Sequence, residues 1–180
     1  MLAKDTTGLI AVDIQGKLAR LVHDSESFIS HCEKLIKAAQ TLALPIIYLE
    51  QNPDKLGSTI EEVHSLLAPL EAIEKFTFNA CEATEFRAAV QAESQVTTWL
   101  VCGIEAHICV YQTAIGLLDR GYDVHLVSDC VSSRTQTNKQ LGITALMNKG
   151  VAITGLEMCL YELVKDCRAP EFRSILGLIR

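Results

Sequence analysis

The fold is decided by one stretch of the chain, Thr98-Trp-Leu-Val-Cys-Gly-Ile-Glu-Ala-His-Ile-Cys-Val-Tyr-Gln-Thr-Ala-Ile-Gly-Leu-Leu-Asp-Arg-Gly121. Its pattern predicts a buried strand that turns at Gly103, then a helix that begins near Ala106 and ends at Gly121. Cys109 falls in the first turn of that helix, where unpaired backbone N–H groups and the positive end of the helix dipole meet. Such surroundings favour a thiolate over a thiol, so we expect Cys109 to be an activated sulfur.

Length and composition describe one ordinary globular domain covering residues 1–180, with 49% hydrophobic and 21% charged residues. The formal net charge of −6 argues against a nucleic-acid partner, since non-specific binding to nucleic acid needs a basic surface. No apolar run approaches the roughly 20 residues of a membrane-spanning helix. We therefore expect no nucleic acid and no membrane among the partners.

Cysteine usage bears on the compartment. The seven cysteines are odd in number and show no C-x-x-C spacing, and the first 15 residues do not resemble a signal peptide. These features predict a cytoplasmic protein whose cysteines are mostly buried thiols.

Strand and helix patterns alternate along the whole chain. Predicted strands cover residues 7–13, 45–50, 72–75, 96–103, 121–129 and 150–154. Predicted helices lie between them, and the apolar end at residues 171–180 is expected to pack on its own domain or on another subunit. This alternation predicts an α/β domain with a parallel sheet.

Three reactive residues fall at or just after the ends of predicted strands: Asp13, Lys75 and Cys109. In open α/β sheets, ligands bind at the carboxyl ends of strands, where the strand order reverses. A carboxylate base, a cation and a thiol would make a usable catalytic set there. Each residue also has an ordinary reading: Asp13 as a turn or cap, Lys75 as a surface charge, and Cys109 as helix packing.

Three segments that contain these residues resemble the isochorismatase-like cysteine hydrolases in order and spacing. They are Ala-Val-Asp13-Ile-Gln, Glu-Lys75-Phe-Thr-Phe-Asn-Ala and Gly103-Ile-Glu-Ala-His-Ile-Cys109-Val. The resemblance covers nearly the whole chain and is closest to a short bacterial subgroup. It implies a three-layer α/β/α sandwich with a six-stranded parallel sheet in the order 3-2-1-4-5-6.

The resemblance also implies a catalytic triad of Asp13, Lys75 and Cys109. Asp13 would accept the thiol proton, and the thiolate would attack a carbonyl carbon to form a thioester. The backbone N–H groups of Glu105 and Cys109 would form the oxyanion hole. Members of the family hold a cis peptide that corresponds to Ile104–Glu105 here.

The chain departs from one branch of this family. Nicotinamidases carry an Asp-x-His…His metal site after the second strand, but that region here reads Glu50-Gln-Asn-Pro-Asp-Lys-Leu-Gly57, with His64 the only nearby histidine. We therefore predict no metal and no other cofactor, and we disfavour nicotinamidase activity. Isochorismatase itself hydrolyses a vinyl ether without a cysteine nucleophile, so Cys109 points away from that reaction.

Further residues are expected near the pocket. Gln15, Phe76 and Phe78 are candidate substrate-binding walls because they are close in sequence to the triad. Arg134 could bind a substrate carboxylate, but it could equally bind a backbone carbonyl or an acidic neighbour. His107 lies two residues before Cys109, and such positions on a helix do not face each other.

The sequence thus predicts a metal-independent cysteine hydrolase that cleaves a C–N bond of a small amide or related acyl compound. Two alternatives stay open: a non-catalytic scaffold or regulatory oligomer on the same fold, and a vinyl-ether hydrolase of the isochorismatase type. The substrate is expected to be a small molecule, and the resemblance implies a homo-oligomer.

Overall fold

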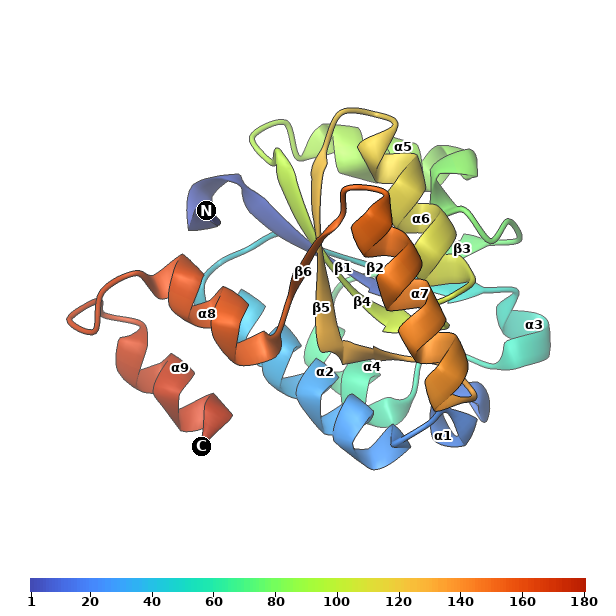
Figure 1. Cartoon of the computed structure of the whole chain (residues 1–180), viewed down its shortest axis with the longest axis horizontal. Helices are drawn as coiled ribbons and strands as arrows, with labels where there is room; N and C mark the ends of the chain where they lie inside the picture. The colour runs from blue at the N-terminus through green and yellow to red at the C-terminus, as the bar shows by residue number, and fades with distance from the viewer.

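A computed structural model describes all residues, 1–180, and is built on one parallel six-stranded sheet (Figure 1). The strands are β1 (Thr7–Val12), β2 (Ile46–Gln51), β3 (Ile73–Lys75), β4 (Thr98–Ile104), β5 (Asp123–Ser132) and β6 (Ala152–Thr154). They lie in the order β3-β2-β1-β4-β5-β6, and every pairing is parallel. The predicted sheet and strand order are confirmed.

Helices cover both faces of this sheet, which makes the predicted three-layer sandwich (Figure 1). One face carries α5 (Thr84–Ala92), α6 (Cys109–Leu118) and α7 (Gln136–Asn148). The other carries α2 (Ser25–Thr41), α4 (Glu61–Leu67), α8 (Leu156–Val164) and α9 (Phe172–Ile179). The shorter elements are α1 (Leu18–Leu21), α3 (Pro53–Leu56) and two 3-10 turns, η1 (Lys4–Thr6) and η2 (Ala80–Glu82).

A separate hydrophobic core fills each side of the sheet. Every residue of β1 is buried, and so is every residue of β4 after Thr98. This explains why these strands read as continuous apolar runs, because a strand covered on both faces has no side that faces water. No helix is both long and apolar enough to cross a membrane.

The C-terminal segment packs on its own domain. Helix α9 lies against α2 and α8, and Ile175 is buried between them (Figure 1). Lys4 Nζ and Glu171 Oε1 are 2.8 Å apart, which ties the start of the chain to the same region. Of the two expected placements for residues 171–180, the structure shows the first.

The strand order reverses between β1 and β4, which are hydrogen-bonded neighbours. Val12, the last residue of β1, pairs with Gly103 of β4. The residues that follow these two strands therefore emerge side by side at the carboxyl edge of the sheet, where open α/β folds bind ligands.

Gly103 is a strand residue, so the turn predicted there is wrong. Strand β4 continues to Ile104, and α6 begins at Cys109 rather than near Ala106. Gly103 has a φ of 114°, and a Cβ atom on it would lie 2.0 Å from the carbonyl oxygen of Val12. Only glycine allows the backbones of β1 and β4 to approach this closely.

We expect Gly103→Ala to lower the free energy of unfolding by about 4 kcal/mol or more, because its methyl group would displace the backbone of β1. Urea unfolding measures the change. Gly177→Ala in α9 is the matched control: a Cβ there meets nothing within 4 Å, so we expect a gain of about 0.5–1 kcal/mol. Equal unfolding midpoints for Gly103→Ala and the native chain would contradict the tight contact.

Candidate active site

Two of the expected site residues form a buried ion pair. The Nζ atom of Lys75 lies 2.7 Å from Oδ2 of Asp13, and the two side chains are 0% and 3% exposed. Lys75 is the last residue of β3, and Asp13 directly follows β1. A buried charge is tolerated only when it is paired and hydrogen-bonded, so each group requires the other.

Gln51 completes this pair and was not expected from the sequence. Its Oε1 atom accepts a second hydrogen bond from Lys75 Nζ at 2.7 Å, and its Nε2 atom donates to the carbonyl of Phe76 at 2.9 Å. Gln51 ends β2 and stands directly opposite Lys75 in the sheet. A polar residue at the end of the strand between those of Asp13 and Lys75 was the available signal.

One carboxylate oxygen of Asp13 makes no hydrogen bond. Its Oδ1 atom is buried and has no hydrogen-bond partner, whereas buried polar atoms are almost always paired. The backbone at Asp13 has a φ of 51°, a left-handed conformation that costs on the order of 1–3 kcal/mol outside glycine and concentrates at functional sites.

A cavity of about 170 Å³ brings Asp13 together with Cys109. Its lining residues are Asp13, Leu18, Gln51, Leu56, Phe78, Ile104, Glu105, Ile108 and Cys109. Lys75 is 1% exposed and is not among these lining residues, but it also acts directly on Cys109, because its charge and a side-chain hydrogen bond lower the pKa of the thiol. A molecule in the cavity would lie against Asp13 and Cys109.

The surroundings of Cys109 do not favour a resting thiolate, so that expectation is wrong. Burial and the nearby charge of Asp13 raise the pKa of the Cys109 thiol to about 12, and the opposing effect of Lys75 is smaller. Burial also raises the pKa of Asp13, although Lys75 acts to lower it. The loss of hydration outweighs the field of the helix N-terminus on which the prediction rested.

The resting site therefore holds a neutral thiol beside a carboxylate–ammonium pair. Moving the thiol proton of Cys109 to Asp13 creates a thiolate without changing the net charge of the group. The proton belongs to the coupled pair rather than to either residue alone. The unpartnered Oδ1 atom of Asp13 is the acceptor available for it.

Two residues that line the cavity also have free backbone N–H donors. Neither the N–H of Glu105 nor that of Cys109 donates to any group of the protein, whereas the neighbouring N–H of Ala106 donates to Ser132 O at 2.8 Å. The peptide between Ile104 and Glu105 is cis. Free N–H groups at a helix N-terminus are suited to bind an anionic oxygen.

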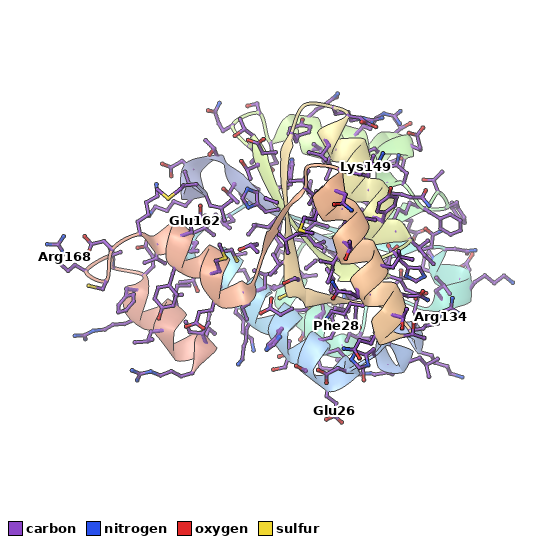
Figure 2. All side chains as sticks on the ribbon, viewed as in Figure 1. Glu26, Phe28, Arg134, Lys149, Glu162 and Arg168 are labelled. Atoms are coloured by element: carbon purple, nitrogen blue, oxygen red, sulfur yellow. The ribbon has the colours of Figure 1, made fainter.

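Arg134 and His107 have protein partners. The Nε atom of Arg134 lies 3.2 Å from Oε1 of Glu105, and its backbone N–H donates to Oε2 at 3.1 Å. Of the three readings for Arg134, the acidic neighbour is the one seen, and its side chain remains 61% exposed near the start of α7 (Figure 2). His107 Nδ1 lies 3.0 Å from Oγ of Ser133 and makes no hydrogen bond with Cys109.

The three predicted pocket walls are placed differently from one another. Phe78 lines the cavity of Cys109, whereas Phe76 is 71% exposed and lines a separate surface groove. Gln15 is fully buried: its Nε2 atom donates to the carbonyls of Gln51 and Gly57, and its Oε1 atom accepts from the N–H of Gln51. Its amide is thus occupied in holding the loop after β2, which leaves it no group for a substrate.

Comparisons with known proteins test the family resemblance. Residues 7–158 match the family model described as the Isochorismatase domain. The chain is 35% identical over 175 residues to the secreted isochorismatase effector Isc1 of Phytophthora sojae, covering 96% of this chain and 83% of that protein. The chain belongs to the isochorismatase family. The resemblance inferred from the three segments is therefore confirmed.

Solved structures share the same fold. The MAR1 ribonuclease from Caenorhabditis elegans matches with a TM-score of 0.92 at 32% identity, covering 99% of this chain and 91% of that one. The YcaC gene product of Escherichia coli, described as an octameric hydrolase of unknown specificity, matches with a TM-score of 0.92 at 21% identity. That match covers 98% of this chain and 89% of the other. The chain thus has the hydrolase fold of the isochorismatase family.

Alkylation of Cys109 tests whether one proton is shared between Asp13 and Cys109 in this isochorismatase-family site. We expect iodoacetamide to label Cys109 at a nearly constant rate from about pH 6.5 to about pH 8.5, because the proton moves within the Asp13 pair, whereas a free thiol with a pKa near 8.5 reacts faster as pH rises. Below the raised pKa of Asp13 the carboxylate becomes protonated and labelling should slow. Peptide mass spectrometry measures the rate.

The Cys167→Ser variant removes the exposed thiol from this measurement, since the other six cysteines are buried. Free glutathione serves as the reference thiol. A rate for Cys109 that climbs with pH in parallel with glutathione would contradict the shared proton.

Proposed function

We propose that this chain is a metal-independent cysteine hydrolase that cleaves a C–N bond of a small amide or related acyl compound. The single observation that carries the proposal is the unpartnered Oδ1 atom of Asp13 in the cavity of Cys109, backed by the 2.7 Å ion pair with Lys75. A carboxylate with an unused acceptor beside a thiol can serve as the general base of a nucleophile.

The reaction begins when Asp13 takes the thiol proton of Cys109 and the thiolate attacks the carbonyl carbon. The resulting tetrahedral oxyanion accepts hydrogen bonds from the N–H groups of Glu105 and Cys109, which have no protein partner. As the C–N bond breaks, protonated Asp13 gives its proton to the leaving amine. Water then hydrolyses the thioester, with Asp13 again acting as base.

Lys75 acts on both Asp13 and Cys109. Its ammonium stabilises the anion that sits on Asp13 in the resting site and on Cys109 after proton transfer. Gln51 fixes the direction of that ammonium through its 2.7 Å hydrogen bond. Such fixed charges lower the barrier because they do not have to reorganise during the reaction.

The size of the cavity supports a small substrate. About 170 Å³ bounded by Phe78, Ile108 and Leu56 accommodates a compact acyl group. The C. elegans relative is named a ribonuclease, but the net charge of −6 works against attraction of a polyanion. We therefore propose a small molecule, rather than RNA, as the substrate of this chain.

A panel of small amides tests this function, with release of ammonia or amine as the readout. We expect Cys109→Ala to reduce turnover of any accepted amide to background, because no other thiol lines the cavity. Cys167→Ala, which removes an exposed thiol, should leave turnover unchanged. Amine release that survives Cys109→Ala would remove this cysteine from the mechanism.

Two further substrates, an RNA oligonucleotide and a vinyl ether, distinguish the alternative functions. An RNA oligonucleotide cleaved only when Cys109 is present would replace the small amide as substrate. A vinyl ether hydrolysed equally well by the native chain and Cys109→Ala would favour chemistry of the isochorismatase type. Complete inactivity of the folded native chain towards every class would favour the scaffold reading.

We also propose that the protein is a cytoplasmic homo-oligomer. The octameric relative shares its fold, and all seven cysteines are free. Light scattering after gel filtration measures the mass in solution. A monomer at every accessible concentration would contradict the oligomer.

A further inference from the structure

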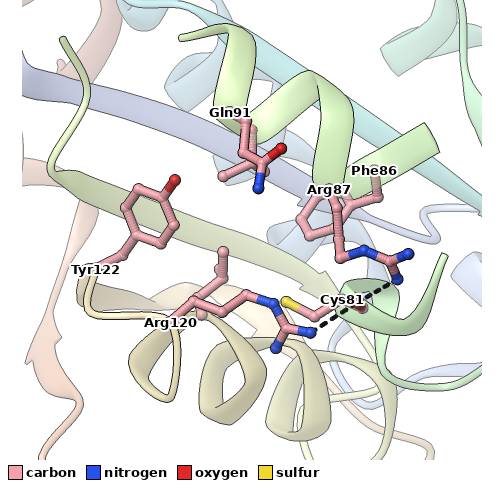
Figure 3. Close-up of a pocket in the computed structure, with 8 residues that line it drawn as sticks. Cys81, Phe86, Arg87, Gln91, Arg120 and Tyr122 are labelled. Carbon is pink, nitrogen blue, oxygen red and sulfur yellow. Dashed lines mark hydrogen bonds between the residues drawn. The ribbon is translucent and has the colours of Figure 1, made fainter. Parts of the chain in front are cut away.

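A second cavity lies on the α5–α6 face of the sheet, between α5, the C-terminal end of α6 and the start of β5 (Figure 3). Its volume is about 220 Å³, and it shares no residue with the cavity of Cys109. Its lining residues are Cys81, Phe86, Arg87, Val90, Gln91, Leu117, Arg120 and Tyr122. The proposed hydrolysis uses none of them.

Two arginines converge at one end of this cavity. Nη1 of Arg87 and Nη2 of Arg120 each donate to the carbonyl oxygen of Cys81 at 3.1 Å (Figure 3). Neither guanidinium is hydrogen-bonded to a carboxylate; the nearest is the 59%-exposed Glu82, with Oε1 3.9 Å from Arg120. Each guanidinium has further neutral acceptors: Arg87 donates to the carbonyl of Glu82 at 2.9 Å and to Oγ1 of Thr84 at 3.1 Å, and Arg120 donates to the carbonyl of Gly116 at 2.9 Å.

Three other arginines of the chain have carboxylate partners. Arg20, Arg134 and Arg168 each lie within 3.2 Å of a Glu or Asp oxygen. The thiol of Cys81 does not supply the missing charge, because burial raises its pKa to about 11. The hydrogen-bond partners of the arginine pair are thus all neutral, and guanidinium groups bind carboxylate and phosphate strongly.

The rest of the lining gives the cavity an apolar body and a polar rim. Phe86, Val90 and Leu117 are buried and form the apolar wall. The amide of Gln91 is directed towards the cavity from α5, and Tyr122 closes the opposite side (Figure 3). Apolar walls with a few convergent polar groups are typical of small-molecule sites.

We propose that this cavity is a second ligand site, which binds a small molecule with one carboxylate or phosphate group and a compact apolar body. The anionic group lies against Arg87 and Arg120, and the apolar part lies against Phe86 and Val90. This site does not depend on the proposed hydrolysis, because binding can be measured without turnover.

One chain of contacts connects this site with the catalytic cavity. Thr113 of α6 accepts a hydrogen bond from the N–H of Ala80 at 3.1 Å and donates one to the carbonyl of Phe78 at 3.4 Å. Ala80 adjoins Cys81, and Phe78 lines the cavity of Cys109.

Titration of the full native chain with benzoate, phenyl phosphate and neutral benzamide, followed by ¹H–¹⁵N NMR, tests the proposal. We expect at least one of the two anions to shift the amide signals of residues 81–91 and 117–122. Benzamide should bind there about tenfold more weakly or worse, because it lacks the charge that pairs with the arginines. The tighter of the two anions identifies the head group.

Two variants make the test independent of any one residue. Arg120→Gln removes one charge and should weaken anion binding about tenfold. Gln91→Glu supplies an internal carboxylate, so it should abolish binding and raise the melting temperature. Gln140→Glu, which adds the same charge on exposed α7, is the control and should change neither quantity.

Three results would overturn the proposal: no shift at residues 81–91 and 117–122 with either anion, equal binding of benzamide, or undiminished anion binding in folded Gln91→Glu. The last result would mean that the anion does not bind against Arg87 and Arg120.

Discussion

Replacing Asp13 with asparagine is expected to lower kcat for amide hydrolysis by about 10³- to 10⁴-fold, because the variant has no base for the Cys109 proton. Asparagine is the appropriate replacement, since it tolerates the left-handed backbone that Asp13 adopts at φ 51°. Its amide oxygen can still accept the hydrogen bond from Lys75. Because the variant also leaves the buried ammonium of Lys75 without its charge partner, the loss reports proton transfer once the variant is shown to be folded.

Steady-state kinetics on an amide accepted by the native chain measures this effect. Asp54→Asn is the matched control, because Asp54 is an exposed residue of α3. The alkylation rate of Cys109 at neutral pH should fall in Asp13→Asn as well, since both reactions need the thiolate. An Asp13→Asn variant with native kcat and native labelling would rule out Asp13 as the base.

Replacing Lys75 with methionine should have a large effect on stability. The pair is almost fully buried, and removing one partner of a buried ion pair costs about 3–5 kcal/mol because the other charge is left unpaired. Burial already raises the pKa of Asp13, and loss of the ammonium removes the main effect that opposes it. A carboxyl whose pKa is raised by folding contributes most stability at low pH and loses it as pH rises.

The loss of unfolding free energy caused by Lys75→Met should therefore be larger at pH 8 than at pH 5, which urea unfolding at both values would show. The double variant Asp13→Asn, Lys75→Met should recover much of the loss, because it leaves no buried charge. Lys4→Met provides the surface control, since Lys4 also forms an ion pair but an exposed one. Equal losses of unfolding free energy for Lys75→Met and Lys4→Met would contradict the importance of burial.

The sequence pattern predicted the elements, and the family resemblance predicted where their ends meet. Apolar runs around Ile10 and Val101 predicted strands buried on both faces, and the alternation with helices predicted the parallel sheet. Once the strand order follows from the family resemblance, the position of Asp13 after β1 and of Cys109 after β4 places both at the same edge. These features depend on local periodicity and on burial, which a sequence displays directly.

The protonation of the site was decided only by the tertiary structure. The helix N-terminus alone predicted a thiolate at Cys109, but burial and the charge of Asp13 outweigh it. Both of those effects come from residues that are distant in sequence. The pKa of a buried group depends on everything packed around it, and no local pattern encodes that sum.

The partners of polar side chains were decided in the same way. Gln15 was expected near substrate but ties the loop after β2, whereas Gln51 was overlooked and fixes the ammonium of Lys75. Arg87 and Arg120 look like ordinary surface charges in the sequence until η2 brings them to one carbonyl oxygen. Periodicity and the resemblance determined the fold and the candidate triad, but hydrogen bonds and ion pairs require distances of about 3 Å, which exist only after distant segments have packed.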